Sequence, residues 1–283
     1  MDVIVTYDLI EDTVYGDNVT ITGKFMDANT KAISNSNVNV YINGKQYKAR
    51  TDKTGTYTLT APATKIGTNT VVVGYGGSAC YNSFEDSTTF NAGKQDVIVT
   101  YETISSVAYG DNVTVTGNFT DKNGKAISNS NVNVYINGKQ YKARTDKTGT
   151  YILKAPATRI GDNTVVVGYG GNACYNSFED NTTFNAGKQS VKVTCKKIRD
   201  VSYGDNVTVT GKFKDKNGKA ISNSNVNVYI NGKQYKARTG KTGTYKLVTP
   251  ATKLGNNTVV VGYGGNDYYT SYETTTTFKV KRK

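Results

Sequence analysis

Residues 32–50 read AISNSNVNVYINGKQYKAR, and this stretch decides the fold. Apolar and polar side chains alternate on both sides of Asn43-Gly44, and a two-residue Asn-Gly loop between alternating strands selects a type I′ turn. The turn fixes the register of the hairpin, so Tyr41 should lie opposite Gln46. The sequence therefore predicts an antiparallel hairpin with one apolar face toward a core and one polar face toward solvent.

The same stretch recurs unchanged at 126–144 and 220–238, an offset of 94 residues. A fixed period of this kind indicates one structural unit in several copies, and its length is close to the roughly 100 residues of an immunoglobulin-type sandwich. We expect three such domains, here called module 1 (1–95), module 2 (96–189) and module 3 (190–283).

Each module shows short runs of period-two alternation separated by Gly, Asn, Asp and Ser, and no segment shows the 3.6-residue period of a helix. The fold class predicted is all-β, with three tandem immunoglobulin-like β-sandwich domains. The joints between them are short, which favours an extended rod of roughly 100 Å at about 3.4 Å per strand residue. Seven strands are expected in module 1, at about 2–8, 18–25, 37–42, 45–51, 55–60, 69–75 and 87–92.

Two further expectations concern packing. The prolines Pro62, Pro156 and Pro250 occupy one position of the repeat and are assigned to a loop, where a missing amide donor does no harm. The core of module 1 is expected to consist of the inward side chains Val19, Ile21, Phe25, Val38, Val40, Tyr47, Ala49, Tyr57, Leu59, Val71, Val73, Tyr75 and Phe90.

No constellation in the sequence indicates catalysis or a bound cofactor. The chain has no His, which removes the commonest general base and metal ligand. Its three Cys do not pair within a module, so free thiols are expected. The run 121–124, Asp-Lys-Asn-Gly, resembles half of a calcium loop, but no acidic ligand closes it. We therefore interpret it as a turn and predict no catalytic, metal or cofactor site.

The formal net charge of +13 is concentrated in one module. Module 1 has 8 Lys and Arg against 9 Asp and Glu, module 2 has 9 against 8, and module 3 has 18 against 5. Because modules 1 and 2 fold without this excess, the charge is either a solvated basic face or a contact with an anionic partner such as a wall polymer or lipid headgroups. The candidate anionic-surface residues are Lys192, Lys196, Lys197, Arg199, Lys214, Lys216, Lys246, Lys279, Lys281, Arg282 and Lys283.

Nucleic acid is not expected as a partner, because no recognition helix, zinc-ligand spacing or RNA-binding aromatic motif accompanies the charge. The chain also has no apolar run long enough to span a membrane and no signal-peptide pattern. It is expected to be a segment whose export signal and anchor lie elsewhere. Asn18, Asn112 and Asn206 each begin an Asn-Val-Thr sequon and are possible glycosylation sites.

The polar face of the hairpin is a second candidate surface. An aromatic ring beside amides and cations is a composition that holds sugars or anionic groups. The alternative is that Tyr41 only stabilises a cross-strand pair with Gln46. This candidate ligand-contact stripe consists of Asn39, Tyr41, Gln46, Lys48 and Arg50, then Tyr135, Lys142 and Arg144, then Tyr229, Lys236 and Arg238.

Three motifs together resemble a known family. They are Tyr-Gly-Asp-Asn-Val-Thr-Val-Thr-Gly at 109–117, Val-Tyr-Ile-Asn-Gly at 134–138 and Thr-Asp-Lys-Thr-Gly-Thr-Tyr at 145–151, each with counterparts in the other modules. The pattern is similar to the bacterial-type immunoglobulin-like repeats of adhesin-like surface proteins from methanogenic archaea.

The resemblance implies an extracellular, cell-attached protein without catalytic residues. Its modules would present a binding surface to a cell-surface glycan, wall polymer or surface protein of another cell. The alternative function is a structural spacer that binds nothing.

Overall fold

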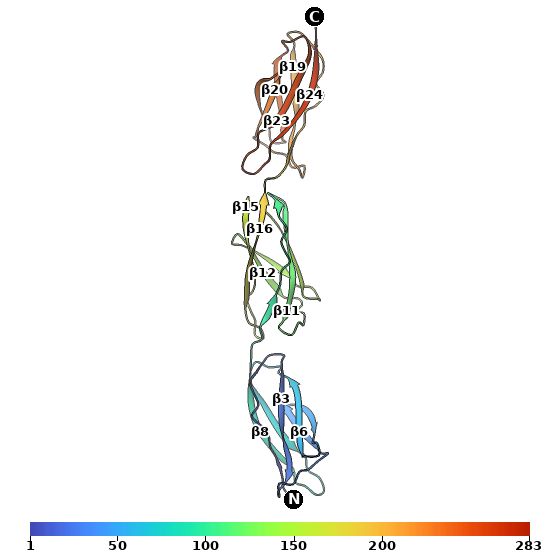
Figure 1. The fold of residues 1–283 in the computed structure, drawn as a ribbon, viewed down its shortest axis with the longest axis vertical. Helices are drawn as coiled ribbons and strands as arrows, with labels where there is room; N and C mark the ends of the chain where they lie inside the picture. Colours follow the sequence, from blue (N-terminus) through green and yellow to red (C-terminus); the bar gives the residue numbers. More distant parts are fainter.

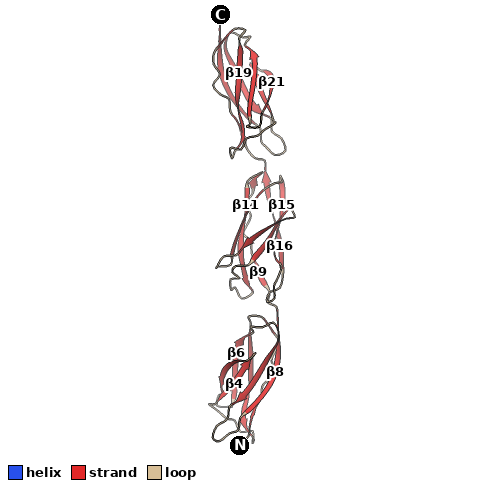
Figure 2. Ribbon diagram, turned by 180° about the vertical axis from the view of Figure 1, so that it is seen from behind, coloured by secondary structure: helices blue, strands red, loops and turns tan.

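The computed structural model describes residues 1–283 and consists of strands, turns and loops. Three immunoglobulin-like β-sandwiches lie end to end, so the chain is an extended all-β rod (Figure 1). The strands of each sandwich run along the rod (Figure 2). No helix with the length and apolarity needed to cross a membrane is present.

Each sandwich packs a three-stranded sheet on a five-stranded sheet. In module 1 the three-stranded sheet has the order β1 (Val3–Val5), β3 (Asn18–Asp27), β6 (Thr56–Pro62). The five-stranded sheet has the order β2 (Thr13–Val14), β8 (Phe84–Gly93), β7 (Gly67–Tyr75), β4 (Asn37–Ile42), β5 (Lys45–Arg50).

Modules 2 and 3 repeat this topology. Module 2 has β9 (Val97–Val99), β11 (Asn112–Asp121), β14 (Thr150–Pro156) in one sheet and β10 (Val107–Ala108), β16 (Phe178–Gly187), β15 (Gly161–Tyr169), β12 (Asn131–Ile136), β13 (Lys139–Arg144) in the other. Module 3 has β17 (Val191–Val193), β19 (Asn206–Asp215), β22 (Thr244–Pro250) and β18 (Val201–Ser202), β24 (Tyr272–Lys281), β23 (Gly255–Tyr263), β20 (Asn225–Ile230), β21 (Lys233–Arg238).

The hairpin register predicted from Asn43-Gly44 is confirmed. Strands β4 and β5 pair Tyr41 with Gln46, and the other pairs follow from Ile42–Lys45 outward to Asn37–Arg50. Asn43 and Gly44 both have positive φ, at 50° and 82°, which a type I′ turn requires. The Asn43 amide also donates to Oδ1 of the buried Asn69 at 2.7 Å, so the turn is tied to β7.

Two sequence-based expectations were wrong in detail. Each module has eight strands instead of seven, because Thr13–Val14 forms a short strand that pairs in parallel with the end of β8. A two-residue strand is too short to show periodicity, so the pattern could not reveal it. Pro62 does not lie in a loop but ends β6, opposite Asn18, where a strand tolerates the missing donor.

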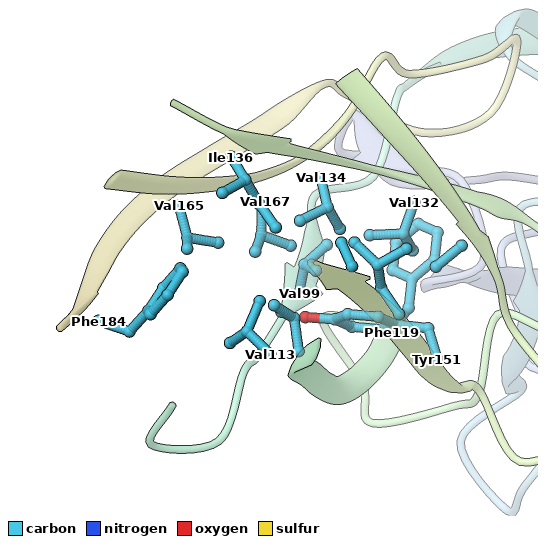
Figure 3. Close-up of a cluster of buried hydrophobic side chains, with 14 of the residues drawn as sticks. Val99, Val113, Phe119, Val132, Val134, Ile136, Tyr151, Val165, Val167 and Phe184 are labelled. Atoms are coloured by element: carbon cyan, nitrogen blue, oxygen red, sulfur yellow. The ribbon is translucent and has the colours of Figure 1, made fainter. Parts of the chain in front are cut away.

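The core of each module lies between its two sheets. In module 2, Val132 and Val134 of β12 and Val165 and Val167 of β15 point into the space between the sheets, toward Val113 and Phe119 of β11 (Figure 3). The predicted core of module 1 is confirmed except at Tyr47, Leu59 and Tyr75, which are only half-buried at its rim. Each fully buried side chain of this size contributes about 1.5–3 kcal/mol, so one module holds a sufficient core.

A buried tyrosine ties the start of each module to its core. The Tyr151 hydroxyl donates to the Thr100 carbonyl oxygen at 2.6 Å, and burial raises the pKa of Tyr151. A Cβ at Gly117 would lie 1.8 Å from the same oxygen, so only glycine leaves room for the chain there. Tyr57 and Tyr245 make the equivalent bonds to Thr6 and Thr194. We call this contact the tyrosine tie.

Gly117→Ala should therefore unfold module 2 at lower denaturant concentration than modules 1 and 3. Overpacking costs about 1–3 kcal/mol or more, and here the clash is with backbone. The three-module chain should show a separate early transition for one module, recorded by circular dichroism in urea. Gly187→Ala is the control, because a Cβ at Gly187 would meet nothing within 4 Å. Identical curves for the two variants would contradict the tyrosine tie.

Candidate binding surfaces and the joints between modules

The structure brings most of the predicted stripe together on the outer face of the five-stranded sheet. In module 1, Tyr41 pairs with Gln46 and Asn39 with Lys48. Nε2 of Gln46 donates to Oδ1 of Asn39 at 3.2 Å, and Gln140 and Gln234 make the same bond in modules 2 and 3. The half-buried tyrosine ring is thus flanked by an oriented amide pair and a lysine in every module.

The arginines of the stripe lie further away. Arg50 pairs with Asn37 at the far end of the hairpin, four residues from Gln46 along β5. In module 2, Nε of Arg144 donates to Oδ1 of Asn129 at 2.7 Å, so that arginine is held by the loop before β12. The arginine is therefore at the margin of the stripe and does not lie beside the tyrosine.

The stripe also continues onto strands that sequence reasoning missed. Asn133 pairs with Gly168 of β15, and Gly168 pairs with Glu179 of β16. The same glycine and glutamate occur in the other modules, as Gly74 with Glu85 and Gly262 with Glu273. The glycine and the glutamate occur at constant positions of the repeat, which the sequence shows. Only the order of the strands in the sheet shows that they lie next to the hairpin.

The predicted basic residues of module 3 lie in four places, of which one forms a continuous face. Lys192 of β17 lies directly opposite Lys214 of β19, and Lys246 of β22 lies opposite Thr210. Lys196 donates its backbone N–H to Thr210, which places it along the same sheet. We call this the lysine face: the outer side of the three-stranded sheet, with Lys192, Lys196, Lys212, Lys214 and Lys246.

None of these five lysines makes an ion pair. At the same five positions module 2 has one charged residue, Glu102, and module 1 has two of opposite sign, Asp8 and Lys24. Lys192 and Lys214 replace Ile98 and Thr120 of module 2, and Ile4 and Met26 of module 1. The face borders a cleft of about 200 Å³, whose lining includes Lys192, Lys212 and Lys214 of the face, Lys216 of the joint and the acidic Asp215. Lys212 was not predicted, because module 1 has a lysine at its position too, Lys24.

The other basic residues lie elsewhere. Lys197 and Arg199 are exposed on the loop after β17, on either side of the buried Ile198. The tail is partly neutralised within module 3, because Lys281 pairs with Asp200 at 3.5 Å and Lys283 with Asp205 at 3.4 Å. Lys216 points into the joint with module 2. The predicted set is therefore not one surface.

The joint between modules 1 and 2 is centred on Gln95 and Asp17. Gln95 is buried, its backbone N–H donates to the Cys174 carbonyl, and its Nε2 donates to Oδ1 of Asp17 at 3.2 Å. Lys122 and Asn123 reach the same carboxylate from module 2, at 2.5 and 3.0 Å. The run 121–124 is thus a turn, as predicted, and it binds the preceding module.

The joint between modules 2 and 3 repeats this arrangement with more aromatic contact. Asp111 accepts from Gln189 at 3.3 Å and from Asn217 at 3.1 Å, and it pairs with Lys216. Tyr109 packs against Tyr268 and Tyr269, with ring centroids 4.7 and 6.2 Å apart. Tyr268 replaces Cys174 of the first joint, where Tyr15 packs on one ring, that of Tyr175.

Both joint aspartates are stabilised in the charged form. The hydrogen bond from Lys122, followed by that from Asn123, holds the pKa of Asp17 below its ordinary value. Lys216 does the same for the pKa of Asp111. A depressed carboxyl pKa stabilises the joint above the ordinary value of 3.8, and this contribution disappears as the pH falls through the depressed value.

The remaining candidates are the sequon asparagines and the cysteines. Asn18, Asn112 and Asn206 are exposed at the first residues of β3, β11 and β19, so their glycosylation stays a prediction. The three cysteines are free, with Cys80 exposed and Cys174 and Cys195 half-buried. No group of three or more Cys, Asp or Glu side chains is arranged to hold a metal ion.

Comparison with known proteins supports the fold. Residues 10–92 match the IPT/TIG domain family. The whole chain is similar to invasin, a bacterial integrin-binding protein, at 17% identity over 99% of this chain and 60% of that one, with a TM-score of 0.51. This similarity supports the immunoglobulin-like architecture.

Two bacterial adhesins align at lower TM-score. A 1.5-MDa ice-binding adhesin gives 17% identity over 99% of this chain and 98% of that chain, with a TM-score of 0.33. The Escherichia coli adhesin FdeC gives 16% over 99% and 96%, also with 0.33. No curated protein sequence matches the chain significantly.

Asp111→Asn should loosen the second joint and leave the first intact. An ion pair of this exposure is worth up to about 1 kcal/mol, so trypsin should cut after Lys188 up to roughly five times faster. Cleavage after Lys94, in the unaltered first joint, is the internal control. The two rates are measured by mass spectrometry of timed digests. Equal acceleration at both lysines, or at neither, would show that the aspartate does not hold the joint.

Proposed function

We propose that the chain is a segment of an adhesin-like protein at the outer surface of a cell. Its modules extend a rod, and the lysine face of module 3 contacts an anionic polymer of a cell wall or glycan coat. The motif resemblance to repeats of methanogen adhesins and the fold similarity to invasin, a bacterial integrin-binding protein, support the adhesin-like part. The role is non-catalytic.

The observation that carries the proposal is the pairing of Lys192 with Lys214. Like charges directly opposite each other on a sheet are destabilising, and the fold does not need them, because module 2 has Ile98 and Thr120 there. A face that served solubility alone would mix both signs of charge. A bound polyanion would remove the repulsion, because its charges would lie between the lysines.

A linear polyanion fits this face better than a discrete ion. Four of the five lysines lie on three neighbouring strands of an open sheet and Lys196 follows the first of these strands, and only part of the set lines the 200 Å³ cleft. A repeating chain of carboxylate, sulfate or phosphate groups can contact several lysines at once. Binding of this kind weakens as salt screens the charges.

The second candidate function is a spacer that sets distance and binds nothing. It is favoured by the two joints, in which buried glutamines and bridged aspartates hold successive modules end to end. Module 3 would then have a basic face only for solubility. The two functions differ in whether the face binds a polyanion.

The proposed function predicts salt-dependent retention of the full chain on immobilised polygalacturonate. A variant of the lysine face, with four module 2 residues and one neutral glutamine, should elute at clearly lower salt than the unaltered chain. The substitutions are Lys192→Ile, Lys196→Gln, Lys212→Asn, Lys214→Thr and Lys246→Ile.

The matched control removes the same number of positive charges elsewhere in module 3, and it should elute nearly where the unaltered chain does. Its substitutions are to Gln at Lys219, Lys233, Lys241, Lys253 and Lys279. If both variants shift equally, the net charge and not the face binds the polymer. If the unaltered chain is not retained even at low salt, the spacer is correct. Duplex DNA as competitor tests the exclusion of nucleic acid.

A further inference from the structure

We propose that the outer face of the five-stranded sheet of module 2 has a groove that binds one ring of an uncharged saccharide. The groove has a volume of about 250 Å³ and lies where β15 ends, with Asn133, Tyr135, Gly168, Phe178 and Glu179 among its lining residues. It is on the opposite sheet from the surface that corresponds to the lysine face. This site is therefore separate from the polyanion contact.

The groove exists because one position of the sheet has no side chain. This position belongs to a row of residues that pair directly across neighbouring strands. Across four strands this row runs Lys142, Asn133, Gly168 and Glu179. A Cβ at Gly168 would lie 3.1 Å from the Phe178 carbonyl oxygen and 3.7 Å from Cγ of Glu179. A side chain at this position would meet its neighbours closely, so the row stays bare at Gly168, and the groove lies over it between Asn133 and Glu179. We call this space the gap.

The groups around the gap are not satisfied by the protein. Oδ1 of Asn133 accepts from Gln140, which turns its NH₂ group outward, and no protein acceptor binds that NH₂. Glu179 is exposed and forms neither an ion pair nor a side-chain hydrogen bond. A donor and a two-oxygen acceptor therefore lie on either side of Gly168, two strands apart.

The ring of Tyr135 completes the site in the next row. It pairs with Gln140 on one side and with Val166 on the other, and it is only half-buried. A hexose has an apolar face of C–H groups and a rim of hydroxyls that both donate and accept. An aromatic ring can pack on the apolar face while the amide and the carboxylate bind hydroxyls at the rim.

Other ligand classes fit less well. Strands β12 and β15 are hydrogen-bonded to neighbours on both sides, so a peptide cannot bind there by adding a strand. Glu179 repels anions, which disfavours polyanions and nucleic acid. The volume of 250 Å³ is below the roughly 300–1,000 Å³ of pockets for drug-sized ligands, so one sugar ring is the expected size.

The same residues recur in the other modules, as Asn39, Tyr41, Gly74 and Glu85 and as Asn227, Tyr229, Gly262 and Glu273. In module 3 a Cβ at Gly262 would lie 2.7 Å from Cγ of Glu273, so that glutamate leans over the gap. Module 2 is more open, at 3.7 Å. Weak single sites at intervals along one rod can combine into firm attachment to a polymer.

Saturation-transfer NMR on the full chain tests the site with the methyl glycosides of glucose, galactose, mannose and N-acetylglucosamine as probes. A background variant, Tyr41→Ala with Tyr229→Ala, leaves only the module 2 groove. At least one glycoside should receive saturation, mainly at the C–H protons of one ring face. Adding Tyr135→Ala should weaken binding by roughly 2- to 10-fold, the range of an aromatic contact, and Glu179→Gln should also weaken it.

Two controls separate binding from folding. Tyr135→Phe keeps the ring and should keep saturation transfer, and Tyr203→Ala removes an exposed tyrosine at the far end of module 3 and should change nothing. All variants should unfold at the same urea concentration as the background.

The proposal is overturned if none of the four glycosides receives saturation, or if transfer survives Tyr135→Ala and Glu179→Gln unchanged. Because the probes are uncharged, removing the five lysines of the lysine face should leave this result as it is. A negative result for the saccharide groove is thus distinguishable from a negative result for polyanion binding by the lysine face.

Discussion

In every module the hydroxyl of one buried tyrosine donates to the carbonyl oxygen of the threonine that follows the first strand, and a glycine on the neighbouring strand leaves room for that carbonyl. This contact involves few residues, but the position of the first strand of each module depends on it. It fixes where the chain enters the sandwich, and the entering residues follow directly from the joint. Gln95 and Gln189 come two residues before β9 and β17, so each joint lies next to a strand that is anchored to the core of its module.

The inward side chains of the three modules are nearly the same, whereas the outward ones differ. Val132 and Val134 have identical counterparts in modules 1 and 3, but the position of Lys192 is isoleucine in the other two modules. Substitutions on an exposed sheet face change stability little compared with substitutions in a packed core. The repeat can thus keep one fold while individual modules acquire different surfaces, which is how one module of three has become strongly basic.

The sequence was sufficient for the features that depend on local chemistry. Asn43-Gly44 determined a turn type, and the turn determined every pair of its hairpin. What failed depended on contacts between distant segments. The strand Thr13–Val14 exists only because β8 lies beside it, and Gly168 and Glu179 join the stripe only through the order of strands in the sheet.

The basic residues show the same limit. Composition revealed that module 3 carries the excess charge, but only the fold shows that Lys216 is bound to Asp111 and that Lys281 and Lys283 have their own acidic partners, whereas the lysine face has none. The sequence pattern also predicted the Asp-Lys-Asn-Gly turn at 121–124, but it did not predict that this turn contacts Asp17 of the preceding module. A contact between two modules produces no periodic pattern of residues in the sequence of either module.

The short second strand has a mechanical consequence. It runs parallel to the last strand of its module, pairing Thr13 with Ala92 and Val14 with Gly93, and the equivalent pairs occur in modules 2 and 3. When the two ends of the rod are pulled apart, an early strand and the final strand of a module are drawn in opposite directions along their length. Their hydrogen bonds are then loaded in shear and must break together, so each module resists extension better than a hairpin that unzips one bond at a time.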